Sequence, residues 1–127
     1  SPLRLHSDRS AVSTISYARA YPEYTITETG QWWYEDHEVD AIGLTQGETL
    51  IAGECKFQQS PLGYDAFSKL QTHVDELRWT PDTGGERREE FALFSRSGFK
   101  SSVEEAATER DDLRLFTVED VVEALRG

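Results

Sequence analysis

The chain has 127 residues, 24 of them acidic and 13 basic, with a formal net charge of −11 and one cysteine, Cys55. This length suits a single domain over residues 1–127, and no apolar run is long enough to cross a bilayer or to act as a secretory leader. One cysteine excludes an internal disulfide framework. Because the chain begins Ser-Pro and contains no methionine, we expect it to be a fragment of a longer protein.

The charge pattern indicates adaptation to salt. The acids are dispersed along the chain, and the only lysines are Lys56, Lys69 and Lys100. A heavily screened acidic surface stays hydrated in molar salt, which favours a halophile protein over the alternative of an acidic mesophilic domain. A charge of −11 disfavours DNA binding at ordinary ionic strength, because phosphate contacts dominate that affinity. In a saline cytoplasm screening weakens this argument, so a nucleic-acid function stays open.

The first half of the chain predicts a helix and then an antiparallel meander. Ser7 or Asp8 is a candidate N-cap for a short helix that ends near Ala20, within a helical segment over residues 1–24. Strand periodicity then follows in YTIT, QWWY, EVDAIGL and TLIAGECKF. Turn signals at TG, EDH and TQGE separate these runs and predict three or four antiparallel strands.

The second half alternates helices and strands. A helix is predicted in SPLGYDAFSKLQTHVDELRW, an interior strand in EFALFS, and a second helix in GFKSSVEEAATER, with Ser101 or Ser102 as its N-cap. LRLFT is a further strand, and TVEDVVEALRG is a closing helix in which Thr117 and Asp120 approximate a capping box. Residues 25–127 therefore predict an α/β core, a mixed central sheet flanked by helices.

Charged residues alternate on two neighbouring strands of the predicted meander. Glu38 and Asp40 share one face of the first strand, and Glu54, Lys56 and Gln58 share one face of the second. A hairpin through TQGE would place the two faces about 4.8 Å apart, one strand spacing. Two carboxylates there can hold Mg²⁺, and a lysine beside them can orient water or neutralise charge on a phosphoryl group. The alternative is a surface lattice of salt bridges.

Cysteine, histidine and tryptophan give weaker signals. Cys55 points away from the charged face, and with Phe57 we expect it to pack against a helix. One cysteine and three scattered histidines match no zinc-ligand spacing. Trp32 and Trp33 are a candidate base-stacking pair, but adjacent strand residues face opposite ways, so we expect one in the core and one partly exposed.

The spacing of the motif carries a resemblance to a known superfamily. Asp40, thirteen intervening residues and then Glu54-Cys55-Lys56 resemble the D-x(n)-(D/E)-x-K signature of the restriction-endonuclease-like PD-(D/E)XK nucleases, whose αβββαβ core has the predicted element order. More narrowly, GQWWYEDHEVDAIGL, IAGECKF, FALFSRSGF and LRLFTVEDVV resemble the carboxyl-terminal domain of unknown function of archaeal AAA-type ATPases.

The resemblance implies a site and a reaction. It implies Asp40 and Glu54 as ligands of Mg²⁺ or Mn²⁺, the main-chain carbonyl of Cys55 as a further ligand, and Lys56 as the catalytic lysine of a DNA endonuclease. The expected supporting residues are Glu38, Gln58 and Lys69. The candidates for phosphate contacts are Lys69, Arg78, Arg87 and Arg88, with Arg96 as a weaker one. We interpret the two arginines in GGERREEF mainly as part of a solvated loop.

The resemblance also implies a cytoplasmic location without membrane contact and a set of partners, and alternative functions stay open. An ATPase domain is expected in the same or a partner chain, and a homodimer is compatible with the superfamily. Many superfamily nucleases take a further acid from the first helix, and RSAVSTISYARAY contains none. That departure favours the rival hypothesis, a catalytically inactive docking or regulatory domain of an archaeal ATPase. A toxin or defence effector is a third, weaker interpretation.

Overall fold

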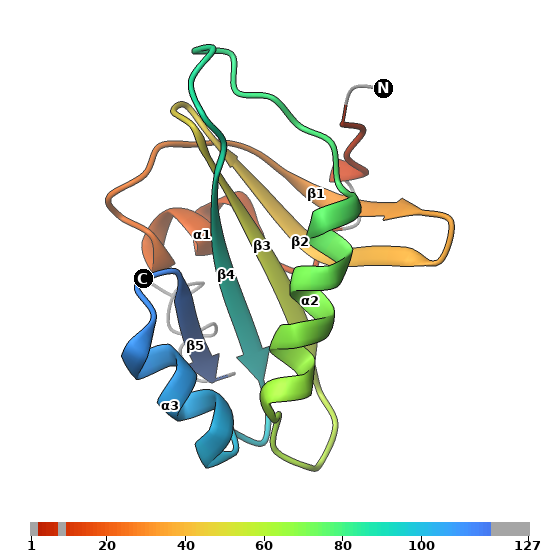
Figure 1. Ribbon diagram of the computed structural model, residues 1–127, viewed down its shortest axis with the longest axis vertical. Coiled ribbons are helices and arrows are strands. Elements are labelled where there is room, and N and C mark those ends of the chain that lie inside the picture. The colour runs from red at the N-terminus through yellow and green to blue at the C-terminus, as the bar shows by residue number, and fades with distance from the viewer. Residues whose placement is uncertain (1–2, 8–9, 118–127) are drawn as a thin grey trace.

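The computed structural model describes residues 3–7 and 10–117 (Figure 1). Its elements in chain order are α1 (Thr14–Ala20), β1 (Ile26–Tyr34), β2 (His37–Thr45), β3 (Thr49–Lys56), α2 (Tyr64–Glu76), β4 (Arg88–Ser95), α3 (Ser101–Glu109) and β5 (Leu113–Thr117). The closing helix predicted over 117–127 lies outside the described residues, apart from its first residue. No helix in the described part is long and apolar enough to cross a membrane.

The five strands form one mixed sheet in the order β1-β2-β3-β4-β5. The pairs β1/β2 and β2/β3 are antiparallel, whereas β3/β4 and β4/β5 are parallel. The hairpins of the meander account for the antiparallel half, and the crossovers through α2 and α3 account for the parallel half. The order α1, β1–β3, α2, β4 is the αβββαβ core, so the predicted restriction-endonuclease-like fold class is confirmed.

Helices cover both faces of the sheet (Figure 1). α2 and α3 pack on one face over a cluster that includes Leu50, Leu93 and, from α2 itself, Leu70. α1 packs on the other face, where Tyr17 and Tyr21 meet apolar side chains of β2, β3 and β4. Consecutive strand residues point to opposite faces, so each strand of the sheet interior contributes to both clusters.

The start of the chain corrects the predicted start of the first helix. α1 begins at Thr14 with Ser13 as its N-cap, whose hydroxyl accepts a 3.1 Å hydrogen bond from the Ser16 N–H. The prediction of a start at Ser7 or Asp8 is wrong, because the segment just before it pairs with β1 instead. The N–H of His6 donates to the Gln31 carbonyl at 2.8 Å, and the Gln31 N–H donates back at 3.1 Å.

The glycine in TG is not a turn but part of one continuous strand, so the meander has three strands. The register shifts between Gly30 and Trp32, which marks an irregularity at this point. A β-carbon on Gly30 would lie 2.8 Å from the Leu5 Cβ and 3.1 Å from the His6 carbonyl carbon. The glycine therefore allows the N-terminal segment to approach β1 closely, a role that local sequence cannot distinguish from a turn.

Candidate functional site

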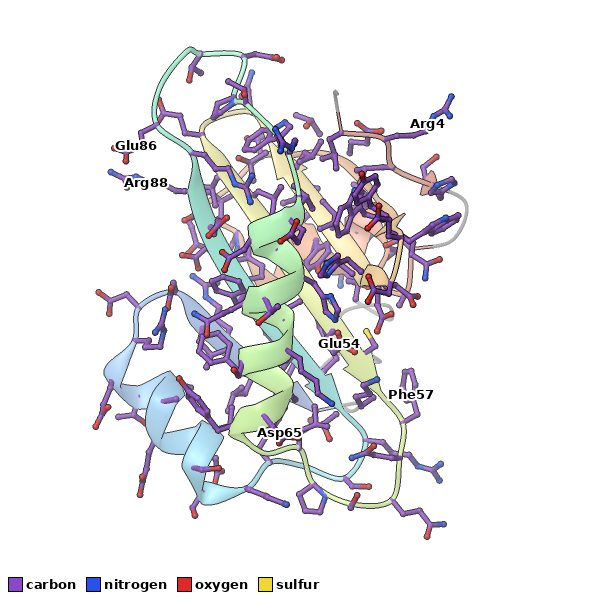
Figure 2. All side chains as sticks on the ribbon, turned by 45° about the vertical axis from the view of Figure 1, so that its right-hand side comes forward. Arg4, Glu54, Phe57, Asp65, Glu86 and Arg88 are labelled. Carbon is purple, nitrogen blue, oxygen red and sulfur yellow. The ribbon has the colours of Figure 1, made fainter. Side chains whose placement is uncertain are left out.

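A cleft of about 460 Å³ opens between α2 and the adjoining ends of β2 and β3. The six acidic, basic and amide side chains predicted for the site all line it: Glu38, Asp40, Glu54, Lys56, Gln58 and Lys69. In Figure 2, Glu54 lies at the end of β3 beside α2, and Asp65 lies at the start of that helix. Four titratable residues that were not predicted for the site also line the cleft: Asp36, Asp65, His73 and Lys100.

Backbone pairing brings the two central carboxylates together. Ala41 of β2 pairs with Gly53 of β3, so Asp40 and Glu54 are the next residues along their strands. One carboxylate oxygen of Asp40 accepts a 3.1 Å hydrogen bond from the Cys55 N–H, which fixes that side chain across the strand pair. The Lys56 ammonium lies 3.1 Å from the Glu54 carboxylate.

Electrostatics at this pair are unfavourable to negative charge. The Glu54 side chain is only 15% exposed, and burial raises the pKa of its carboxyl, with the Asp40 charge raising it further. Lys56 opposes this shift, and Glu54 in turn raises the pKa of the lysine through their hydrogen bond. Lys56 is half-exposed and offsets only part of the cost. A bound cation would supply the missing positive charge.

The face beneath the carboxylates is held by α1. Tyr17 is fully buried, and its hydroxyl donates a 2.7 Å hydrogen bond to the Ala41 carbonyl, next to Asp40. Its ring lies over Gly43, and its hydroxyl lies over Gly53, where added β-carbons would be 3.1 Å and 2.2 Å away. No sequence-based prediction included this contact, although two glycines on the same face of neighbouring strands, diagonal to each other, were an available signal.

Cys55 packs against apolar side chains, whereas Phe57 is exposed. Cys55 packs against the apolar cluster on the α1 face, as predicted, and burial raises the pKa of its thiol to about 12. Phe57 is 63% exposed, so the prediction that it packs is wrong. β3 ends at Lys56, and the following residue is no longer held against the sheet. Metal ligation by the Cys55 carbonyl stays a prediction.

The four arginines predicted to contact phosphates, Arg78, Arg87, Arg88 and Arg96, lie outside the residues that line the cleft. The Arg87 guanidinium donates to the carbonyls of Leu77 and Val74 at 2.7 and 3.1 Å, where it caps the end of α2. The solvated-loop interpretation is therefore wrong for Arg87. Arg88 is exposed at the start of β4, and the Arg96 N–H donates to the Lys56 carbonyl at 3.1 Å. Nucleic-acid contact by these arginines stays a prediction.

The two adjacent tryptophans differ in exposure, and the histidines make contacts with other aromatic rings. Trp32 is 6% exposed and Trp33 is 43% exposed, as expected for adjacent strand residues. Trp33 stacks on His6 with ring centroids 3.6 Å apart. His37 and His73 approach at 3.0 Å between their Nδ1 atoms. Among residues 3–7 and 10–117, no group of three or more histidine, cysteine or acidic side chains is arranged to hold a metal ion.

Comparison with known proteins shows that about half of the chain is similar to one protein family. Residues 12–72 match the model of the DUF234 family, described as archaea bacterial proteins of unknown function. The matched segment contains the cleft acids Asp40 and Glu54 together with Lys56, and the match confirms the resemblance derived from the sequence. The chain matches no curated protein.

Two solved structures are similar to the chain. One is a repair endonuclease from Pyrococcus abyssi, with 14% identity, a TM-score of 0.48, and coverage of 81% of this chain and 42% of that chain. The other is AF1548, a protein of unknown function, with 17% identity, a TM-score of 0.46, and coverage of 89% and 65%. The chain thus spans less than two thirds of the length of either protein.

Proposed function

We propose that this domain is a divalent-metal-dependent DNA phosphodiesterase, an endonuclease module of a longer cytoplasmic archaeal protein. The observation that carries the proposal is the pair Asp40 and Glu54 on neighbouring strands, facing one cleft, with Lys56 beside them. The raised pKa of Glu54 supports it, because a carboxylate held at an electrostatic cost is a candidate functional group.

The donor set fits Mg²⁺ or Mn²⁺. Both ions prefer oxygen ligands, and Mg²⁺ is usually held by one or two carboxylates with several waters. Asp40 uses one oxygen for the Cys55 N–H, which leaves the other available, and the Cys55 carbonyl is a proposed third ligand. When bound, the ion would lower the pKa of a bound water and stabilise negative charge on the phosphoryl oxygens.

Lys56 and Glu38 would have the remaining roles in the reaction. Lys56 would donate to the phosphoryl oxygens or to the attacking water, as the water oxygen adds to phosphorus and the bond to the leaving sugar oxygen breaks. Glu38 lines the same cleft and raises the pKa of Glu54 through its charge. Glu38 would replace the acid that α1 lacks, since α1 packs on the opposite face of the sheet.

A second candidate is a docking or regulatory domain without catalysis, attached to an ATPase in the same or a partner chain. The absence of an acidic residue in α1 and the net charge of −11 favour it. In that case the Glu54–Lys56 pair would be a structural ion pair, and the domain would have no need of a divalent cation.

The test is cleavage of labelled duplex, single-stranded and branched DNA with Mg²⁺ or Mn²⁺, from low to molar KCl. Asp40→Asn and Lys56→Gln should each reduce the rate at least about 100-fold, the scale on which such stabilising groups act. Asp75→Asn, an exposed acid on α2 outside the cleft, should cleave like the wild type. Circular dichroism checks folding, and calorimetry measures Mn²⁺ affinity. A wild-type domain that neither cleaves nor binds Mn²⁺ would support the docking candidate.

A further inference from the structure

All three lysines of this acidic chain line the same cleft. Lys56, Lys69 and Lys100 come from β3, α2 and the segment before α3, yet they converge on one opening. None of the described arginines lines it. In a chain of net charge −11, the cleft therefore collects the lysine ammonium groups in one place.

Backbone contacts fix where Lys100 lies. Its N–H donates to the Leu62 carbonyl at 2.7 Å, and the Leu62 N–H donates to the Gly98 carbonyl at 3.1 Å. These bonds hold the segment before α3 against the start of α2. The Lys100 stem covers Gly63, where an added β-carbon would be 3.1 Å from the lysine Cδ. Lys100 is thus placed at the α2 end of the cleft.

Lys69 and Lys100 differ from Lys56 in having no partner for their charge. Lys56 pairs with Glu54, whereas within residues 3–7 and 10–117 the side chains of Lys69 and Lys100 make no ion pair or hydrogen bond. Both are exposed. An ammonium group with three free donors beside a cleft can bind an anionic oxygen, and two such groups on separate elements can bind two.

We propose that Lys69 and Lys100 bind backbone phosphates of a polynucleotide strand, next to the phosphate that faces Asp40, Glu54 and Lys56. The class of ligand rests on the proposed function. The carboxylate of Asp65, which also lies against Gly63, opposes an anion there and weakens binding. The lysines supply affinity and position rather than base specificity, because phosphate contacts carry no sequence information.

The experiment measures binding without catalysis. Fluorescence anisotropy of labelled single-stranded and duplex oligonucleotides is recorded in EDTA over a series of KCl concentrations. Lys69→Gln and Lys100→Gln, which keep the aliphatic stems, should each weaken binding and reduce the slope of log K against log[KCl] by about 0.7 for single strands or 0.9 for duplex. Asp65→Asn should tighten binding. Arg78→Gln is the control, because this exposed cation lies two residues beyond the end of α2 and outside the cleft lining.

Two results would overturn the proposal. If the lysine variants change affinity and slope no more than Arg78→Gln, or if the wild type binds neither oligonucleotide, the assignment is wrong. Failure of the proposed function looks different: the wild type binds through Lys69 and Lys100 but never cleaves with Mg²⁺ or Mn²⁺. Conversely, cleavage abolished by Asp40→Asn, with binding insensitive to both lysines, leaves the nuclease and removes the phosphate contacts.

Discussion

The contact between α1 and the strands under the cleft predicts a large effect of Gly53→Ala. The added β-carbon would lie 2.2 Å from the Tyr17 hydroxyl oxygen, 3.2 Å from the Ala41 carbonyl oxygen and 3.3 Å from the Phe94 ring. The hydroxyl would have to withdraw by about 1 Å to reach a normal contact distance. That movement breaks the 2.7 Å hydrogen bond to Ala41 in a fully buried site.

The magnitude follows from two separate costs. Overpacking a dense interior costs about 1–3 kcal/mol, and a buried polar group that loses its partner costs about 1–3 kcal/mol. Replacing a strand glycine by alanine returns only about 0.5–1 kcal/mol of backbone entropy. Gly53→Ala should therefore lower the free energy of unfolding by about 1–5 kcal/mol.

Urea unfolding at constant KCl measures this difference, with Gly47→Ala as the matched control. Gly47 has open space around its β-carbon position, so its substitution should change stability by less than about 0.5 kcal/mol. Tyr17→Phe removes the atom that the new β-carbon meets, so the double variant with Gly53→Ala should show a favourable coupling above about 1 kcal/mol. A near-neutral Gly53→Ala, or strict additivity in the double variant, would refute the packing argument.

Three further predictions concern charge. Arg87→Leu should cost about 1.5–3 kcal/mol in urea unfolding, because two carbonyls at the end of α2 lose a charged donor, while exposed Arg88→Gln should cost little. The folded-state pKa of Glu54 is raised above its ordinary 4.5, so this group destabilises the fold as pH rises through its folded pKa. Glu54→Gln should therefore raise the Tm at pH 7, and the gain should vanish below pH 4.5; a pH-independent gain would contradict this. With a pKa of about 12, the Cys55 thiol should react about 10³-fold more slowly with iodoacetamide at pH 8 in the folded than in the urea-unfolded chain.

The strand pattern was sufficient to predict the centre of the cleft. Side chains alternate with a period of two, and a short hairpin fixes the register, so Asp40, Glu54 and Lys56 share a face wherever the meander forms. The same alternation correctly put Cys55 on the other face and one of the two tryptophans in the core. These predictions depend only on neighbouring strands, which the local sequence specifies.

The predictions that failed depend on contacts between distant segments. Gly30 has the local context of a turn, but it makes room for the N-terminal segment beside β1. Arg87 is flanked by glutamates like a solvated residue, but it caps a helix that ends well before it in the sequence. Lys100 joins the cleft only because its segment pairs with the start of α2. No periodicity in the chain encodes these approaches.

The two faces of the β2–β3 hairpin explain how the carboxylate pair is held. Asp40 and Glu54 repel each other across neighbouring strands, and burial adds to the cost. The Lys56 ion pair and the hydrogen bond from the Cys55 N–H offset part of that repulsion, and contacts that fix the backbone from the opposite face limit it further. Tyr17 does this at Ala41 and Gly53, the residues adjoining the two acids and paired with each other. We infer that the buried tyrosine holds the acids at a constant separation, which is the condition for two carboxylates to act on one cation.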